Sequence, residues 1–103
     1  MTYALKLHRK VEKQLARIPR KFRSRIVNSM RDLCKEPRPH GSVKLDQILY
    51  RIRIGQYRVI YAVFDEELII FVCKVARRTD ATYRDLRILL DQAIDEVRGN
   101  EID

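Results

Sequence analysis

Polar and apolar residues alternate in the middle of the chain, which is typical of β-strands. Residues 50–54 read Tyr-Arg-Ile-Arg-Ile, so Arg51 and Arg53 share one face of the expected strand and the apolar side chains share the other. Two longer runs follow, over residues 57–64 and 68–75, and both are rich in β-branched and aromatic residues. The pattern therefore predicts three consecutive antiparallel strands.

Short polar turns join these strands. Gly55 and Gln56 form a two-residue turn, in which glycine can take the positive φ that a tight hairpin needs, and the acidic segment 65–67 forms the next turn. A two-residue loop places Arg53 directly opposite Arg58, and like charges in that position usually reduce stability. The cationic face is therefore either a solvated surface or a site that awaits an anion, gripped by arginine guanidinium groups.

Before the strands, apolar residues recur at the spacing of amphipathic helices. Val11, Leu15 and Ile18 predict a first helix, which Pro19 ends because proline offers no backbone donor. A second helix is predicted over residues 22–33, and the two helices form an antiparallel hairpin that covers one face of the sheet. Their cationic outer sides are read either as solvated surface or as contacts to nucleic-acid phosphates.

The two ends of the chain add one element each. Residues 2–7 alternate and predict an edge strand, and residues 86–97 keep the helical period until Gly99-Asn100 ends that helix. The expected fold is a single α+β domain over residues 1–103. It has an N-terminal strand, a two-helix hairpin packed on a mainly antiparallel sheet of three to four strands, and a C-terminal helical segment over residues 79–103.

The charge distribution favours a polyanionic partner. The net charge is +8 overall, and it divides into +9 over residues 1–42, +3 over residues 43–78 and −4 over residues 79–103. A basic body of this kind most often binds nucleic acid. The acidic side of the last helix is either solvated, a shield for the basic site, or part of a groove for a partner.

Composition also excludes several classes of protein. No apolar run approaches the roughly 20 residues of a membrane span, and no signal peptide opens the chain, so a cytoplasmic protein without membrane contact is expected. Cys34 and Cys73 fall within apolar patterns and are expected to be buried and reduced. With His8 and His40 they do not complete a metal-ligand set, so neither metal nor cofactor is predicted.

The central segment YRIRIGQYRVIYAVFDEELIIFVCKVARR resembles the core of the RelE/ParE toxin superfamily, in its RelE-type form. The shared series is a strand with alternating basic residues, a Tyr-Arg strand, an acidic turn, an apolar strand, and a basic pair followed by a tyrosine. The resemblance extends over nearly the whole chain, although the two helices match only by pattern. It implies a RelE-like fold and the toxin component of a type II toxin–antitoxin system.

The resemblance further implies an endoribonuclease, an mRNA interferase that needs no metal and cuts messenger RNA in the ribosomal A site. The ribose 2′-hydroxyl would attack the adjacent phosphate and leave a 2′,3′-cyclic phosphate and a 5′-hydroxyl. Such chemistry needs a base, cations around the phosphorane, and a proton for the leaving oxygen.

The resemblance also assigns roles to individual residues. Arg58 and Arg78 would clamp the phosphate, and Tyr83 would stack on a base or act as the general base, so these three are the expected catalytic residues. The expected RNA-binding residues are Arg51, Arg53 and Arg77.

The chain departs from the family in three ways. The family often has lysines where this chain has Arg51 and Arg53, and arginine cannot be deprotonated in proteins, so phosphate binding rather than proton transfer is expected there. The turn at residues 55–56 is shorter than in many relatives, and the spacing from Arg78 to Tyr83 is about one residue tight. His40, in a loop after the second helix, is the reserve acid or base.

Two other functions compete with the ribonuclease. ParE-type members share the fold but poison DNA gyrase without nuclease activity, and a non-catalytic RNA-binding module would bind RNA and leave it intact. Any toxin of this kind implies a cognate antitoxin and a toxin–antitoxin hetero-oligomer. The antitoxin would lay a helix in a groove or add a strand at the sheet edge near residues 2–7.

Overall fold

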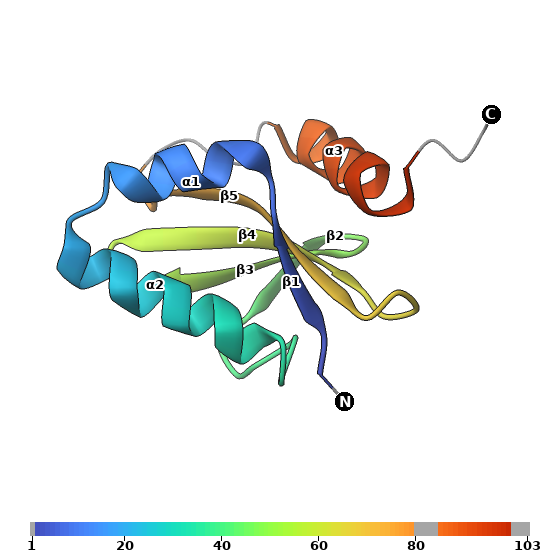
Figure 1. The fold of residues 1–103 in the computed structure, drawn as a ribbon, viewed down its shortest axis with the longest axis horizontal. Helices are drawn as coiled ribbons and strands as arrows, with labels where there is room; N and C mark the ends of the chain where they lie inside the picture. Colours follow the sequence, from blue (N-terminus) through green and yellow to red (C-terminus); the bar gives the residue numbers. More distant parts are fainter. Residues whose placement is uncertain (1, 80–84, 100–103) are drawn as a thin grey trace.

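The computed structural model describes residues 2–79 and 85–99 of the chain. Along the sequence they form a strand, two helices, four strands and a final helix (Figure 1). The elements are β1 (Ala4–Leu7), α1 (Arg9–Ala16), α2 (Arg20–Leu33), β2 (Val43–Asp46), β3 (Leu49–Ile54), β4 (Tyr57–Phe64), β5 (Ile69–Arg77) and α3 (Leu86–Arg98). The predicted α+β architecture is confirmed.

The strands form one mixed sheet in the order β1-β5-β4-β3-β2. β1 runs parallel to β5, and the other neighbours are antiparallel. The predicted edge strand and the mainly antiparallel sheet are confirmed. The predicted count of three to four strands was wrong, because β2 brings the sheet to five. β2 has only four residues, too few for a periodic signal, and its pairing with β3 makes it a strand.

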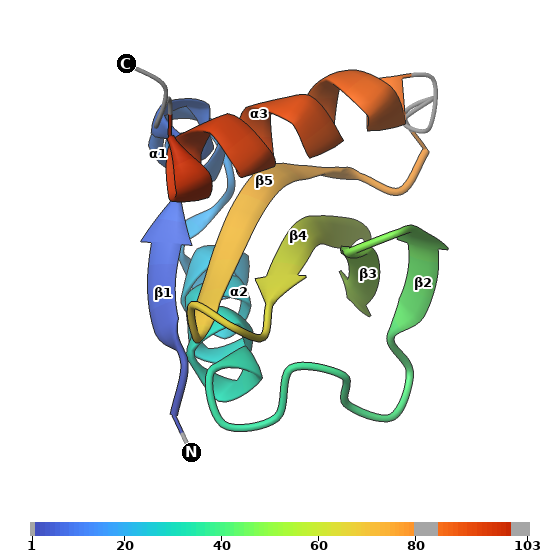
Figure 2. The same cartoon turned by 90° about the vertical axis from the view of Figure 1, so that its right-hand side faces the viewer.

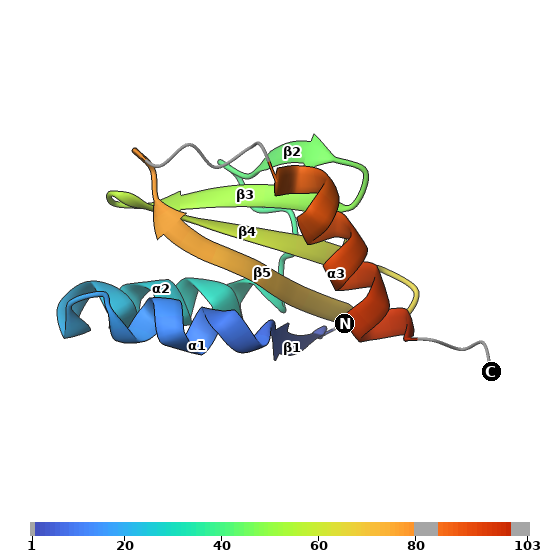
Figure 3. The ribbon, with the colours of Figure 1, turned by 90° about the horizontal axis from the view of Figure 1, so that it is seen from above.

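Each face of the sheet has its own apolar core. α1 and α2 cover one face, where Val11, Leu15, Ile26 and Met30 pack against strand residues such as Tyr61. α3 lies on the opposite face, as Figures 2 and 3 show. There its buried residues pack on side chains of β3, β4 and β5, and the cluster contains Leu49, Ile60, Ala62, Phe64, Phe71, Cys73, Leu89, Leu90 and Ala93. The predicted helical hairpin on one face is confirmed.

The β3–β4 hairpin has the predicted register. Ile54 pairs with Tyr57 and Arg53 with Arg58, so the loop holds only two residues. Gly55 takes a φ of 60°, which fits a primed hairpin turn with glycine in first place. The predicted third strand was shifted, since Leu68 lies in the preceding turn with a φ of 58° and β5 continues to Arg77.

Helix boundaries differ slightly from the predicted ones. α1 ends at Ala16, two residues before Ile18, and Pro19 is the residue before α2 rather than a simple stop. Proline fits there because its fixed φ suits the start of a helix and its missing N–H costs no helical hydrogen bond. The residue after α3 is Gly99 with a φ of 67°, in agreement with the predicted end.

A polar cluster ties the loop after α2 to the sheet. The Tyr3 hydroxyl donates to Asp65 Oδ1 at 2.6 Å, and Arg38 Nη2 donates to Asp65 Oδ2 at 2.7 Å. Arg38 Nε also donates to the Tyr50 hydroxyl at 3.0 Å. The hydroxyl of buried Tyr61 donates to the Pro37 carbonyl at 2.7 Å, and burial raises the pKa of Tyr61 to about 12. This cluster holds together segments far apart in the sequence.

The cysteines, the helix lengths and the possible metal ligands can be described for the same part of the chain. Cys34 and Cys73 are both buried and free, as predicted. Within residues 2–79 and 85–99, no helix is long and apolar enough to cross a membrane. Over the same residues, no three His, Cys, Asp or Glu side chains gather in a way that could hold a metal ion.

Candidate functional site

A group of cations shares one face of the sheet. Arg53 lies directly opposite Arg58, and Arg51 lies opposite Ile60, which itself lies opposite Lys74. Directly opposed side chains project from the same face of a sheet. The residues Arg51, Arg53, Arg58 and Lys74 therefore form one surface, called here the cationic face.

The end of β5 is tied to this face by two hydrogen bonds. Arg58 Nη2 donates to the Arg78 carbonyl at 2.5 Å, and the Arg78 backbone N–H donates to the Gln56 carbonyl at 2.8 Å. The β3–β4 turn thus holds Arg78 beside Arg58. The structure therefore places the Arg78 backbone next to the Arg58 side chain, the two residues to which the resemblance assigned the phosphate.

α3 leaves the arginines of the cationic face accessible. Figure 3 shows α3 crossing one end of the strands, with the β3–β4 hairpin at the other end. Arg53 and Arg78 are exposed, while Arg51 and Arg58 are half-buried. Guanidinium groups in this arrangement can bind several phosphate oxygens and stabilise added negative charge. They cannot transfer protons, because arginine stays protonated.

Arg77 and Tyr83 are the two predicted site residues that the structure does not assign to the cationic face. Arg77 is opposite Tyr57, which is part of the core under α1 and α2. The side chains of Arg77 and Arg58 therefore leave the sheet on opposite faces. Arg77 lines a hollow beside α1 together with Arg17 and Lys74, and it also lines a smaller hollow together with Arg78. Tyr83 lies outside the described residues, so its assigned role stays a prediction.

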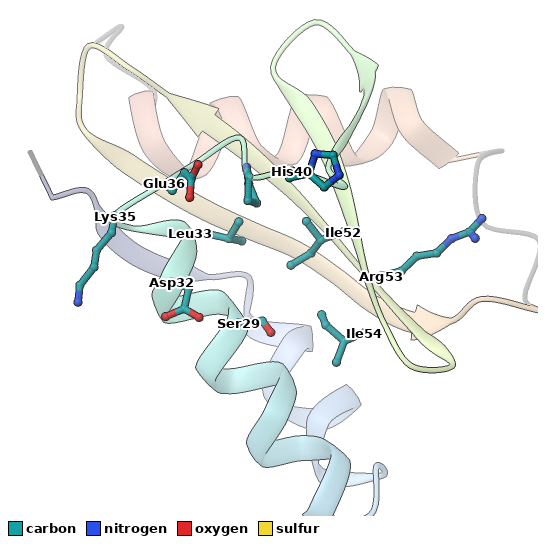
Figure 4. A pocket seen from close by; sticks show the side chains of 10 residues that line it. Ser29, Asp32, Leu33, Lys35, Glu36, His40, Ile52, Arg53 and Ile54 are labelled. Carbon is teal, nitrogen blue, oxygen red and sulfur yellow. The ribbon is translucent and has the colours of Figure 1, made fainter.

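His40 lies beside a pocket of about 480 Å³ between α2, the loop after it and β3. Figure 4 shows Ile52 and Ile54 pointing toward α2, while the Arg53 side chain points away from them. The pocket lining combines apolar residues such as Leu33 with charged residues such as Asp32. The structure therefore places His40 over the helix-covered side of β3 rather than beside Arg58.

Lys74 is the residue of the cationic face that sequence reasoning missed. Its ammonium forms an ion pair with Asp85 Oδ2 at 3.2 Å, which links β5 to the start of α3. The available signal was its position in the strand, two residues before Ala76 and four before Arg78. A β-bulge between Val72 and Lys74 breaks the alternation that the first residues of β5 begin, so only the register shows that Lys74 shares the face of the arginines.

Comparison with known proteins identifies the family. The family described as the ParE toxin of the type II toxin–antitoxin system parDE matches residues 5–82. This chain belongs to the RelE/ParE toxin family. The putative toxin RelE1 of Methanocaldococcus jannaschii is 28% identical over 86 residues, which cover 79% of this chain and 96% of that protein.

Solved structures of RelE toxins have the same fold. The toxin chain in the archaeal RelE–RelB complex from Pyrococcus horikoshii OT3 is 33% identical and superposes with a TM-score of 0.68, over 79% of this chain and 100% of that one. A double arginine-to-alanine mutant of the E. coli toxin RelE in the free state is 21% identical, with a TM-score of 0.69 over 94% and 99% of the two chains. The resemblance to the RelE/ParE superfamily is thus confirmed, and the chain is a toxin of a type II toxin–antitoxin system.

Proposed function

We propose that this toxin is an endoribonuclease that cuts messenger RNA in the ribosomal A site without a metal ion. The observation that carries the proposal is the pairing of Arg53 with Arg58, together with the hydrogen bond from Arg58 to the Arg78 carbonyl. Arg53 and Arg58 stand opposite each other on neighbouring strands, and the backbone of Arg78 is held beside Arg58. A phosphodiester is a ligand that such a group of guanidinium side chains suits. The high net charge of +8 favours the same polyanionic substrate.

The proposed reaction is attack of the ribose 2′-hydroxyl on the adjacent phosphate. Arg58 and Arg78 bind the nonbridging oxygens and stabilise the phosphorane, where charge develops in the transition state. Arg51 and Arg53 hold the RNA backbone on β3. Tyr83 stacks on a base or takes the proton of the 2′-hydroxyl. The products are a 2′,3′-cyclic phosphate and a 5′-hydroxyl.

A cognate antitoxin completes the proposal. The family is a toxin family of type II toxin–antitoxin systems, and toxins similar to this chain were solved in complexes with RelB. We expect an antitoxin that binds the basic body in a toxin–antitoxin hetero-oligomer. Its acidic or amphipathic segments would complement the positive charge and block the cationic face.

The test is cleavage of a defined messenger RNA by purified toxin, with and without ribosomes, followed by mapping of the 5′ ends. Cuts that require ribosomes and carry 5′-hydroxyl ends are expected. Arg78→Ala should reduce the rate by about 10²–10³-fold, the usual effect of removing one group that stabilises transition-state charge. Cuts in free RNA would retain the chemistry and change the substrate. Intact RNA in every reaction, from folded protein that is toxic in cells, would refute the ribonuclease.

A gyrase poison is the second candidate, since the family that matches residues 5–82 is described by its ParE toxin. This function needs no convergent phosphate site, so Arg58→Ala should leave toxicity unchanged. Purified toxin would then stabilise cleaved DNA in a gyrase assay and leave RNA intact. A third outcome, salt-sensitive RNA binding without either activity, would identify a non-catalytic RNA-binding module.

A further inference from the structure

Lys74 is the only lysine in the three central strands β3, β4 and β5. It lies opposite Ile60, in the same cross-strand row as Arg51. Because Arg58 lies opposite Ala76, Lys74 is the diagonal neighbour of Arg58. Diagonal neighbours are about 7–8 Å apart at the backbone, within reach of long side chains. The register therefore allows a long side chain at position 74 to extend toward a phosphate bound by Arg58.

Asp85 directs Lys74 instead of capping its own helix. Asp85 immediately precedes α3, a position where aspartate usually accepts a hydrogen bond from the first turn. Its side chain makes no such bond, and its Oδ2 accepts from Lys74 Nζ at 3.2 Å. Its Oδ1 is buried and has no hydrogen-bond partner within the described residues. The carboxylate is thus committed to Lys74 rather than to helix stability.

Lys74 remains accessible although it is held. Its side chain is 26% exposed, and it lines a cavity of about 240 Å³ between α1, β5 and α3. The titratable groups that line the cavity with it are His8 and Lys10 from the start of α1, Cys73 from β5, and Asp85. Asp85 is the only carboxylate among these lining residues, so it is the group that fixes the ammonium in place.

The proposed cleavage needs a proton that the arginines do not supply. When the bond between phosphorus and the 5′-oxygen breaks, the leaving oxygen must be protonated. Arg51, Arg53, Arg58 and Arg78 bind charge but remain protonated in proteins. A lysine ammonium can give up a proton, and Lys74 is the lysine among the four residues that form the cationic face.

We propose that Lys74 is the general acid of the cleavage reaction and that Asp85 is its positioning residue, an inference that rests on the proposed ribonuclease function. The 2′-oxygen forms a bond to phosphorus, and its proton passes to the general base. The bond from phosphorus to the 5′-oxygen breaks, and Lys74 Nζ gives its proton to that oxygen. Solvent then returns a proton to the neutral amine.

The experiment compares two RNA substrates on programmed ribosomes after the cleavage position has been mapped. One carries the natural 5′-oxygen at that position, and the other carries a bridging 5′-sulfur, which leaves without a proton. Lys74→Arg keeps the positive charge but cannot donate a proton. We expect it to slow cleavage of the oxygen substrate by at least about a hundredfold, the usual lower range for general acid catalysis. On the sulfur substrate it should cut within tenfold of the wild type.

Asp85→Asn should show the same pattern with a smaller effect, about tenfold on the oxygen substrate. Lys44→Arg is the matched control, because Lys44 is an exposed strand lysine opposite Tyr50, on the other face of the sheet. It should leave both rates unchanged. Circular dichroism verifies that each variant is folded, and Lys74→Gln replaces Lys74→Arg if the latter is not.

The outcomes separate this inference from the function on which it rests. If the wild type cuts and Lys74→Arg cuts the oxygen substrate equally fast, Lys74 is not the general acid. If Lys74→Arg slows both substrates to the same extent, Lys74 binds RNA only, and the inference is also wrong. If the wild type cuts neither substrate, the ribonuclease proposal falls and takes this inference with it.

Discussion

Arg53 and Arg58 stand directly opposite each other on β3 and β4. Like charges in this position are destabilising, and a two-residue hairpin allows no shift of register to separate them. The arrangement therefore lowers the stability of the fold and concentrates positive charge at one place on the sheet. An arrangement of this kind is expected where an anion binds.

Replacing Arg53 should show how much stability the opposed arginines cost. Arg53→Gln is expected to raise the free energy of unfolding by about 0.2–1 kcal/mol at low salt, because it removes one of two opposed charges. The gain should shrink in 1 M salt, where charges are screened within about 3 Å. Urea unfolding at both salt concentrations measures it. Arg31→Gln, on the exposed side of α2, is the control and should change stability little. A loss of stability in Arg53→Gln would contradict the interpretation.

Substitutions of the neighbouring residues Arg77 and Arg78 should compare the two faces of the sheet. Arg78 follows β5 and its carbonyl accepts from Arg58, whereas Arg77 is opposite Tyr57 on the helix-covered side. Arg78→Ala should reduce cleavage by about 10²–10³-fold, and Arg77→Ala by less than about tenfold, as for a residue that only adds to RNA affinity. Single-turnover rates at saturating toxin give the comparison. Equal losses in both variants would mean that the RNA crosses the sheet edge.

Asp65 should contribute an acid-sensitive part of the stability. Hydrogen bonds from Arg38 and then from Tyr3 lower the pKa of Asp65 below its ordinary value. A depressed pKa in the folded state stabilises the fold above the unfolded-state pKa of about 3.9, and this stability is lost as the pH falls through the folded-state pKa. Asp65→Asn should therefore cost about 1 kcal/mol at pH 7, since the ion pair is exposed. The deficit should shrink as the pH falls through the folded-state pKa of Asp65 and vanish once that carboxylate is protonated.

The control for this prediction is Asp46→Asn, because Asp46 is an exposed strand acid that forms no ion pair with the described residues. Its unfolding free energy should follow the wild type across the pH range. A deficit in Asp65→Asn that stays the same across the whole acid range would show that hydrogen bonding to the neutral side chain, rather than the charge, stabilises the cluster.

Gly55 should limit the stability of the hairpin that holds Arg78. A Cβ at this position would meet no atom within 4 Å, so only the φ of 60° opposes a side chain. Gly55→Ala is expected to cost about 1 kcal/mol, and Gly55→Asn less, because asparagine tolerates a positive φ better. Thermal unfolding measures both variants. Equal melting temperatures for Gly55→Ala and the wild type would show that the turn adjusts its backbone.

The elements with strong periodic signals were predictable. The alternation over residues 50–54 and the Gly55-Gln56 turn determine the β3–β4 register, because a shift of one residue would place Arg53 in the core beneath α2. The apolar stripes of α1 and α2 determine the face that those helices cover. β2 was missed because a strand of four residues is too short to show a periodic pattern. The start of β5 was misplaced by one residue, because Leu68 in the turn is apolar like the strand that follows it.

Some features of the candidate site were also predictable from the sequence, and others were not. Local patterns determine strands, turns and faces. The sequence was therefore enough to predict the distribution of charge, the opposed arginines and the resemblance of the central segment to RelE toxins. Whether Arg77 or Lys74 joins the cationic face was decided only by tertiary structure. A β-bulge in β5 resets its alternation, and the ion pair with Asp85 depends on where α3 docks. Such contacts join residues distant in sequence, and packing of the whole chain determines them.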